Sequence, residues 1–165
     1  LDCVGLRYFN VFGPRQSKEG PYAAVIPVWV GKLLQGEECV INGDGETSRD
    51  FCYVENAVQA NLLAAVTPTP TTTTTSGAGP KHAVFNVACG ARTTLTALHA
   101  MLRDGLVARK KASPAATPTY APFRPGDVRH SLADVSRAAA ALDYAPTHDV
   151  KAGLDAALDW YVDHA

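Results

Sequence analysis

Short runs of β-forming residues alternate with amphipathic helical patterns along this chain, and this alternation limits the fold more than any other feature of the sequence. Alternating or β-branched residues predict strands over residues 3–8, 39–42, 51–53, 84–88 and 117–120. Apolar residues three and four positions apart predict helices over residues 26–35 and 54–66, and helices that begin near residues 95, 132 and 150. Strands and helices that take turns in this way predict an α/β fold, not a helical bundle or a β-sandwich.

Several helix ends are marked by residues with a specific backbone role. Gly36 is predicted to end the first helix. Thr94 and Asp149 are predicted N-caps, because their side-chain oxygens can accept hydrogen bonds from the first turn. Ser131 and Asp134 have the spacing of a capping box, with Asp in place of the usual Glu or Gln, and predict the start of an alanine-rich helix.

Residues 67–80 are rich in Thr, Pro and Gly and contain five consecutive threonines. Such a segment cannot bury enough apolar surface to offset the entropy lost on ordering. We therefore predict a flexible insertion here, within one domain.

Composition excludes several classes of protein. With 47% apolar and 19% charged residues, the 165-residue chain has the make-up of an ordinary globular domain. It has no apolar run near the roughly 20 residues that span a bilayer, and its net charge of −1 comes from scattered Lys and Arg. We expect no membrane or nucleic-acid partner and a cytosolic location. The four cysteines form no C-x-x-C pair and are predicted to be buried free thiols, and the histidine spacing predicts no metal site.

Two motifs indicate a function. Residues 6–16 read Leu-Arg-Tyr-Phe-Asn-Val-Phe-Gly-Pro-Arg-Gln, and residues 42–56 read Asn-Gly-Asp-Gly-Glu-Thr-Ser-Arg-Asp-Phe-Cys-Tyr-Val-Glu-Asn. Together they resemble the signature of extended short-chain dehydrogenase/reductases that rearrange nucleotide-linked sugars, in particular the NAD-dependent UDP-N-acetylglucosamine 4-epimerases. The resemblance extends from about residue 6 to residue 161.

The resemblance implies that the chain corresponds to the second half of such an enzyme. Residues 1–16 would end the Rossmann domain as its edge strand, and residues 17–165 would form the α/β lobe that binds substrate. The family's glycine-rich loop and its Tyr-x-x-x-Lys pair lie before this region, and neither Tyr8 nor Tyr53 is followed four residues later by Lys. We therefore expect no catalytic residue in this chain and no epimerase activity from it alone. NAD would be the cofactor of the whole enzyme, with Phe9 on the nicotinamide side, and homodimer contacts would lie outside these residues.

A sugar nucleotide offers a charged diphosphate, a ribose diol and a flat uracil, so its site needs guanidinium groups, a carboxylate and amide groups beside an apolar slot. By the resemblance, Arg49 and Arg124 hold the diphosphate, Asp127 accepts from the ribose and Asn10 contacts the diphosphate. Asp127 could instead only stabilise its own Pro-Gly bend. The remaining expected substrate contacts are Gln16, Ala24, Val25, Val40 and Asn42.

Ser131 is the expected specificity residue, because family members that accept N-acetylated sugars carry a small residue at this position. It could also serve as a helix cap. The predicted function is the UDP-sugar-binding part of a UDP-N-acetylglucosamine/UDP-glucose 4-epimerase. The alternatives are a nucleotide-sugar 4,6-dehydratase, a uronate epimerase, or a stand-alone nucleotide-binding or interaction module.

Overall fold

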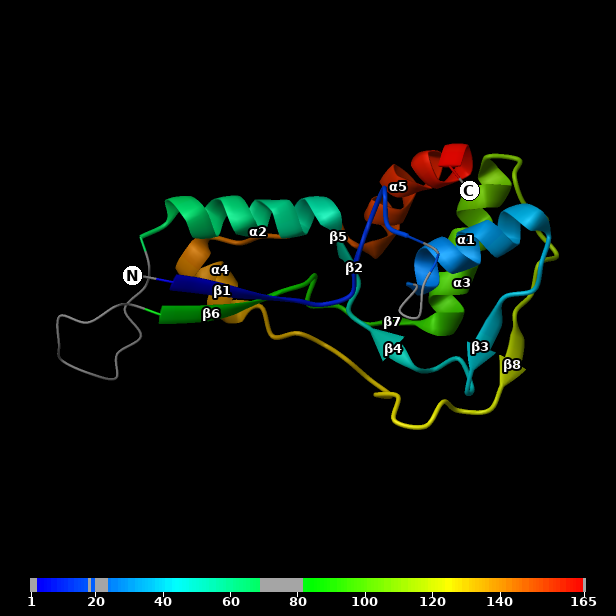
Figure 1. Ribbon diagram of the computed structural model, residues 1–165, viewed down its shortest axis with the longest axis horizontal. Coiled ribbons are helices and arrows are strands. Elements are labelled where there is room, and N and C mark those ends of the chain that lie inside the picture. The colour runs from blue at the N-terminus through cyan, green and yellow to red at the C-terminus, as the bar shows by residue number, and fades with distance from the viewer. Residues whose placement is uncertain (1–2, 18, 20–23, 69–81, 165) are drawn as a thin grey trace.

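A computed structural model of the protein describes residues 3–17, 19, 24–68 and 82–164 (Figure 1). The predicted insertion at 67–80 lies almost entirely outside the described residues. The strands are β1 Cys3–Tyr8, β2 Val11–Phe12, β3 Val40–Asn42, β4 Ser48–Arg49, β5 Cys52–Tyr53, β6 His82–Val87, β7 Thr93–Thr94 and β8 Thr119–Ala121. The helices are α1 Val25–Gln35, α2 Val54–Val66, α3 Leu95–Ala108, α4 Ser136–Leu142 and α5 Val150–His164. Strands and helices alternate along the chain as predicted.

The first of two apolar cores lies on one face of a parallel strand pair. β1 and β6 pair in parallel over their whole length, and β6 alternates between buried residues such as Phe85 and exposed residues such as Val84. Its buried face packs against Ala57 and Ala60 of α2 and against Leu142 of α4. Because successive side chains of a strand point to opposite sides, every second residue of β6 lies on this buried face.

The second core is formed mainly by helices α1, α3 and α5, on the other side of the molecule in Figure 1. Trp29 of α1, Leu98 and Leu102 of α3, and Leu154 and Leu158 of α5 are all buried in it. Strands β3 and β8 pair in parallel beside these helices, and β4 pairs antiparallel with β7. The short parallel pair of β2 and β5 joins the two parts, because Phe12 belongs to the second core and Cys52 to the first.

The division between these cores does not follow the boundary expected after residue 16. Helix α2 and strand β6 contact β1, and α4 packs against β6 in the same core, although all three lie far beyond residue 16 in the sequence. The chain therefore crosses between the two parts several times.

Three predicted helix ends are confirmed. Gly36 follows α1 with φ 71°, a left-handed conformation that glycine adopts without strain. The Thr94 side chain accepts a hydrogen bond from the amide of Ala97 at 3.1 Å. Asp149 Oδ1 accepts one from the amide of Ala152 at 2.8 Å.

The predicted capping box at Ser131 is wrong, since α4 begins five residues later, at Ser136. The amide of Ser131 instead donates to the carbonyl of Ser48 at 3.0 Å, and Asp134 accepts from the amide of Ser136 at 2.9 Å. This bond and the β-bridge between His130 and Ser48 hold the segment against β4, a strand far away in sequence. The local capping pattern could not reveal this competitor.

The prediction of buried thiols holds for Cys39 and Cys52, while Cys89 is half-buried and Cys3 is exposed on β1. The described residues contain no helix with an apolar stretch long enough to cross a bilayer.

His99 makes the stability of the fold dependent on pH. It lies on α3 with 1% of its surface exposed, edge-on to the Trp29 ring at 5.8 Å, and its Nε2 has no hydrogen-bond partner among the described residues. Burial lowers the pKa of His99, and the nearby Arg103 charge lowers it further. The unfolded chain, with an ordinary histidine pKa of about 6.5, then binds more protons than the native state as the pH falls below that value.

We therefore expect His99 to cost stability below about pH 6.5, by at most about 1.4 kcal/mol for each pH unit down to its native pKa. Urea denaturation at pH 7.5 and 5.5 would measure the loss. His99→Leu should reduce the difference in stability between the two pH values. An equal pH dependence in wild type and His99→Leu would contradict this assignment.

Candidate functional site

One cavity of about 550 Å³ gathers most of the residues expected to bind substrate. The expected residues in its lining are Asn10, Ala24, Val25, Val40, Asn42, Arg49, Arg124 and Asp127. They come from segments that are widely separated in the sequence. Its size lies within the usual range for small-molecule sites.

Strand ends place the polar residues of this cavity. Asn10 follows β1 after one residue, Asn42 is the last residue of β3, and Arg49 is the last residue of β4. Ligand-binding groups in α/β folds commonly lie beyond the carboxyl ends of parallel strands, where loops begin.

A glycine turn brings the segment that carries Arg124 next to β3. Gly43 has φ 90°, its amide donates to the carbonyl of Ala121 at 2.7 Å, and a Cβ on it would lie 2.2 Å from the Phe123 ring. Only a residue without a side chain allows this approach. A second bend at Gly126, with φ 79°, returns the amide of Asp127 to the carbonyl of Arg124 at 3.2 Å.

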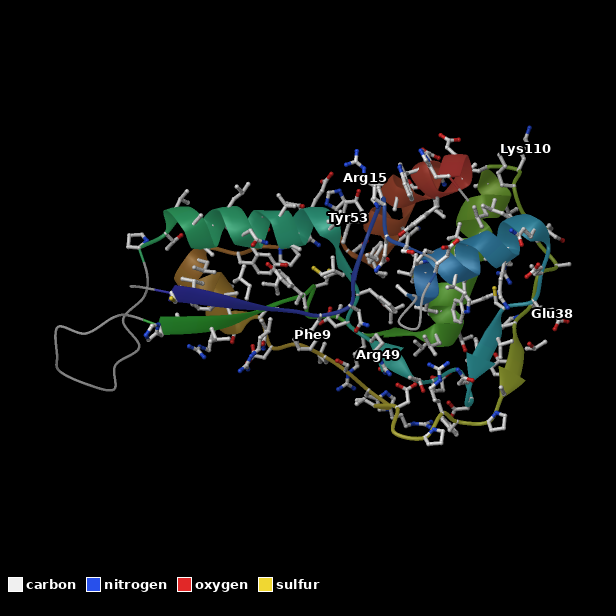
Figure 2. All side chains as sticks on the ribbon, viewed as in Figure 1. Phe9, Arg15, Glu38, Arg49, Tyr53 and Lys110 are labelled. Carbon is white, nitrogen blue, oxygen red and sulfur yellow. The ribbon has the colours of Figure 1, made fainter. Side chains whose placement is uncertain are left out.

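Figure 2 labels Arg49 beside β4. Its guanidinium is held by several acceptors. It donates to the carbonyl of Ser48 at 2.9 Å, to that of Arg129 at 3.4 Å, and to Asp127 Oδ1 at 2.6 Å. A guanidinium has five N–H donors. These three contacts therefore orient the group and leave other N–H donors available to a ligand. Arg49 and Asp127, which the sequence assigns to different parts of a ligand, are thus bonded to each other in this structure.

A second ion pair holds the same segment to the β3–β4 connection. Arg129 pairs with Asp44, and its guanidinium lies 5.0 Å from the centre of the Phe123 ring. The Arg129 side chain lowers the pKa of Asp44 through this bond, with help from the amide of Glu46. Arg124 and Asp127 therefore belong to an exposed segment that is attached to Gly43 through Ala121 at one end and to Asp44 through Arg129 at the other.

The cavity lining is positively charged, although the whole chain is slightly acidic. Lys32, Arg49 and Arg124 face a single carboxylate, that of Asp127. This balance favours an anionic ligand, and guanidinium groups suit phosphate oxygens in particular.

Residues 1–87 match the model of the NAD dependent epimerase/dehydratase family. The chain belongs to this family. Solved structures of UDP-sugar 4-epimerases share its fold, which confirms the α/β architecture predicted from the sequence.

One such structure is a UDP-N-acetylglucosamine 4-epimerase from Methanobrevibacter ruminantium in complex with UDP-N-acetylmuramic acid. It is 39% identical with a TM-score of 0.83, over all of this chain and 47% of that one. A putative UDP-glucose 4-epimerase of Methanocaldococcus jannaschii is 30% identical over 97% of this chain and 46% of its own length. The UDP-glucuronic acid 4-epimerase of Bacillus cereus, solved with UDP-glucuronic acid and NAD, is 26% identical with a TM-score of 0.74, over 97% of this chain and 45% of its own. The chain thus spans about half the length of the relatives it matches.

The cofactor prediction is confirmed for the family, which is NAD-dependent. The 165 residues contain no G-x-G-x-x-G sequence, the glycine pattern typical of a dinucleotide phosphate turn. Phe9, the expected nicotinamide neighbour, is half-buried at the end of β1, and its amide donates to the carbonyl of Val87 at 3.0 Å. It lies outside the cavity lining.

Asp50 supports the site of this epimerase/dehydratase chain and was not predicted. Its side chain is 0% exposed and accepts the amides of Cys89 at 3.0 Å, Gly90 at 3.0 Å and Ala133 at 3.1 Å. Burial raises the pKa of Asp50, and these backbone donors oppose that rise. Asp50 follows Arg49 directly, so it joins the strand that carries Arg49 to two distant loops. The position of Asp50 in the Ser-Arg-Asp-Phe motif is the sequence feature that could have indicated this role.

Several other apolar residues that line the cavity were not predicted from the sequence. Val28 and Trp29 line the cavity together with Val25 and Lys32, at the i, i+3, i+4 and i+7 positions of α1. This spacing places the four residues on one helix face and was visible in the sequence. Thr47, Phe51 and Leu95 complete the lining.

Two expected substrate residues lie outside this cavity. Gln16 lines a separate depression beside Trp160, and its amide donates to the carbonyl of Val11 at 2.9 Å. Ser131 is half-buried and is attached through its backbone to Ser48, the neighbour of Arg49.

Proposed function

We propose that this chain forms the UDP-sugar-binding part of an NAD-dependent nucleotide-sugar 4-epimerase. The observation that carries the proposal is the positively charged cavity, in which Arg49, Arg124 and Asp127 lie beside apolar walls. Membership of the epimerase/dehydratase family supports it. Hydride transfer is assigned to parts of the enzyme other than these residues, since no tyrosine here is followed four residues later by Lys.

In the proposed complex the two arginines bind the diphosphate and Asp127 accepts from the ribose hydroxyls. Asn10 and Asn42 supply amide groups, while Val25, Val40 and Ala24 lie along the uracil. Epimerisation through a 4-keto intermediate requires the sugar to turn over while the nucleotide stays in place. Charged and hydrogen-bonding residues directed at the nucleotide meet this requirement, because they hold one end of the ligand and leave the sugar free to rotate.

Arg124→Ala and Arg49→Ala are each expected to weaken UDP binding by about 1.5–3 kcal/mol, the range for a hydrogen bond to a charged group. Arg49→Ala should have the larger effect, because it also leaves the Asp127 carboxylate uncompensated beside the diphosphate. Isothermal titration with UDP would measure both losses. Arg103→Ala, which removes an arginine paired with Asp104 on α3 away from the cavity, should bind like the wild type. Unchanged affinity in both cavity variants would exclude the diphosphate site.

The preferred sugar is proposed to be UDP-N-acetylglucosamine, with UDP-glucose as a second substrate. The small Ser131 would leave space for the acetamido group. In the active enzyme, Ser131→Tyr is expected to lower kcat/KM for the N-acetylated sugar by at least about tenfold relative to UDP-glucose, because the ring would fill that space. Ser131→Ala is the control, as it keeps the space. An unchanged ratio for the tyrosine variant would remove Ser131 from substrate selection.

We further propose that the whole enzyme is a cytosolic homodimer that supplies sugar nucleotides to polysaccharide synthesis. The same family includes dehydratases and uronate epimerases, so product analysis with UDP-N-acetylglucosamine, UDP-glucose and UDP-glucuronic acid would distinguish these activities. Formation of the galacto epimer is the expected result, and loss of water or turnover of the uronate alone would contradict it.

A further inference from the structure

A second cavity, of about 270 Å³, lies where α1 ends, and it shares no lining residue with the cavity described above. Helix α3 contributes His99 to it, and the connection from α1 to β3 contributes Glu37 and Glu38. Figure 2 labels Glu38 in this connection. The connection between α3 and β8 closes the remaining side. The volume lies below the range for drug-sized ligands, so the cavity suits a smaller molecule.

His99 gives this cavity a buried polar group without a partner. The residue is 1% exposed, and its Nε2 has no hydrogen-bond partner among the described residues. A buried polar atom left in this way costs stability, and a ligand group that bonds to it removes the cost. A hydroxyl suits this place, because it can both donate and accept and therefore fits either tautomer of the ring.

The exposed side of the cavity is acidic. Glu37 and Glu38 are both exposed, and within the part of the chain that the structure describes no ion pair holds either carboxylate. The lining contains neither lysine nor arginine. Its apolar part is formed by Leu33, Ala115 and Ala116. These groups suit a small molecule with a hydroxyl at one end, an apolar body and a positive charge at the other end.

We infer that this cavity is a binding site for a small hydroxylated organic amine. The ammonium group lies against the carboxylates of Glu37 and Glu38, and the hydroxyl bonds to Nε2 of His99. Because Nε2 is closed to solvent in the free protein, binding requires a small outward shift of residues 113–117, which belong to neither a helix nor a strand.

Helix α1 links this cavity to the proposed UDP site. Lys32 lines the UDP cavity, and its Nζ donates to the carbonyl of Glu38 at 3.1 Å. Trp29 also lines the UDP cavity, and its ring lies edge-on to that of His99 at 5.8 Å. A bound amine fixes the connection from α1 to β3, and with it Lys32, so it should tighten the binding of a diphosphate. This coupling rests on the proposed function, whereas amine binding does not.

Tyramine is the probe for this site. Isothermal titration of the protein at pH 7.5 should show one saturable site with a Kd of about 1 mM or below. Phenethylamine lacks the hydroxyl, and tyrosol carries an uncharged hydroxyl in place of the ammonium. Each should bind at least about threefold more weakly than tyramine, because it loses one polar contact. Absence of saturable tyramine binding to the folded protein, or equal affinity for the three compounds, would overturn the inference.

Variants assign the two ends of the ligand. Glu37→Gln combined with Glu38→Gln should weaken the binding of tyramine and leave that of tyrosol unchanged. His99→Leu should weaken the binding of tyramine and leave that of phenethylamine unchanged. Asp163→Asn is the control, because it removes an exposed carboxylate of α5 that lies outside this cavity. Tyramine binding that is unchanged in both cavity variants would place the amine elsewhere and overturn the inference.

UDP titration with and without saturating tyramine tests the coupling. Tyramine should lower the Kd for UDP about fivefold, a typical size for coupling between two sites, and UDP should lower the Kd for tyramine by the same factor. Equal UDP affinity with and without tyramine would disprove the coupling. Failure of the protein to bind UDP at all would instead refute the proposed function, and the tyramine titration would still decide the amine site.

Discussion

Asp50→Ala is expected to lower the free energy of unfolding by about 3–5 kcal/mol, since an unsatisfied buried donor costs about 1–3 kcal/mol. The carboxylate accepts the amides of Cys89, Gly90 and Ala133, and the alanine variant leaves all three without this acceptor. Partial entry of water into the space keeps the total below the sum of three full penalties. The three amides come from two loops, one at residues 89–90 and one at residue 133.

Urea denaturation at pH 7.5 would measure the effect. Asp50→Asn should lie between wild type and Asp50→Ala, because its amide keeps one accepting oxygen and turns an NH2 toward the remaining donors. Asp104→Ala, at an exposed carboxylate on α3, is the control and should change stability by less than about 0.5 kcal/mol. A loss below 1 kcal/mol for Asp50→Ala would show that the loops do not depend on this carboxylate.

Asn56→Ala should also be strongly destabilising, by about 2–4 kcal/mol. Asn56 lies on α2 with 0% of its surface exposed. Its Oδ1 accepts the amides of Thr147 and His148 at 2.9 and 3.1 Å, and its Nδ2 donates to the carbonyl of His148 at 2.7 Å. The side chain therefore holds the connection between α4 and α5 against α2, and alanine would leave three backbone groups without these bonds.

Asn61→Ala is a matched control, because Asn61 lies on the same helix but is exposed. It should cost less than about 1 kcal/mol. Thermal or urea unfolding of both variants would test the difference. Because Ala is a better helix former than Asn, propensity alone would stabilise both variants. Similar losses for Asn56→Ala and Asn61→Ala would therefore show that the buried bonds of Asn56 are not the cause.

Sequence patterns predicted best the elements whose periodicity and end residues all lie within the element itself. Cys3–Tyr8 and Val54–Val66 begin and end where the patterns placed them, and α1 ends at Gly36 as predicted. The two-residue strands β4 and β7 were not predicted, because a strand of two residues has no periodicity of its own. They exist because Ser48 pairs with Thr94 and Arg49 with Thr93, contacts that only the folded chain creates.

In the candidate site, too, the residue types could be predicted from the sequence, whereas their contacts could not. Arg49, Arg124 and Asp127 could be chosen from the sequence, since motifs surround them and their charges suit a nucleotide sugar. Their mutual arrangement could not, and the Arg49–Asp127 ion pair at 2.6 Å joins residues 78 positions apart.

The sequence by itself thus determined the α/β class, the helices, the glycine turns and the charged residues available for an anion. Each of these depends on local periodicity, on backbone preference or on side-chain chemistry. Only the tertiary structure decided that Asp50 and Asn56 are buried and hydrogen-bonded to distant loops, and that Ser131 bonds to Ser48 of β4 in place of capping α4. Burial and long-range hydrogen bonding depend on which distant segments come together. A buried carboxylate or amide such as these therefore acquires its role only after the chain has folded around it.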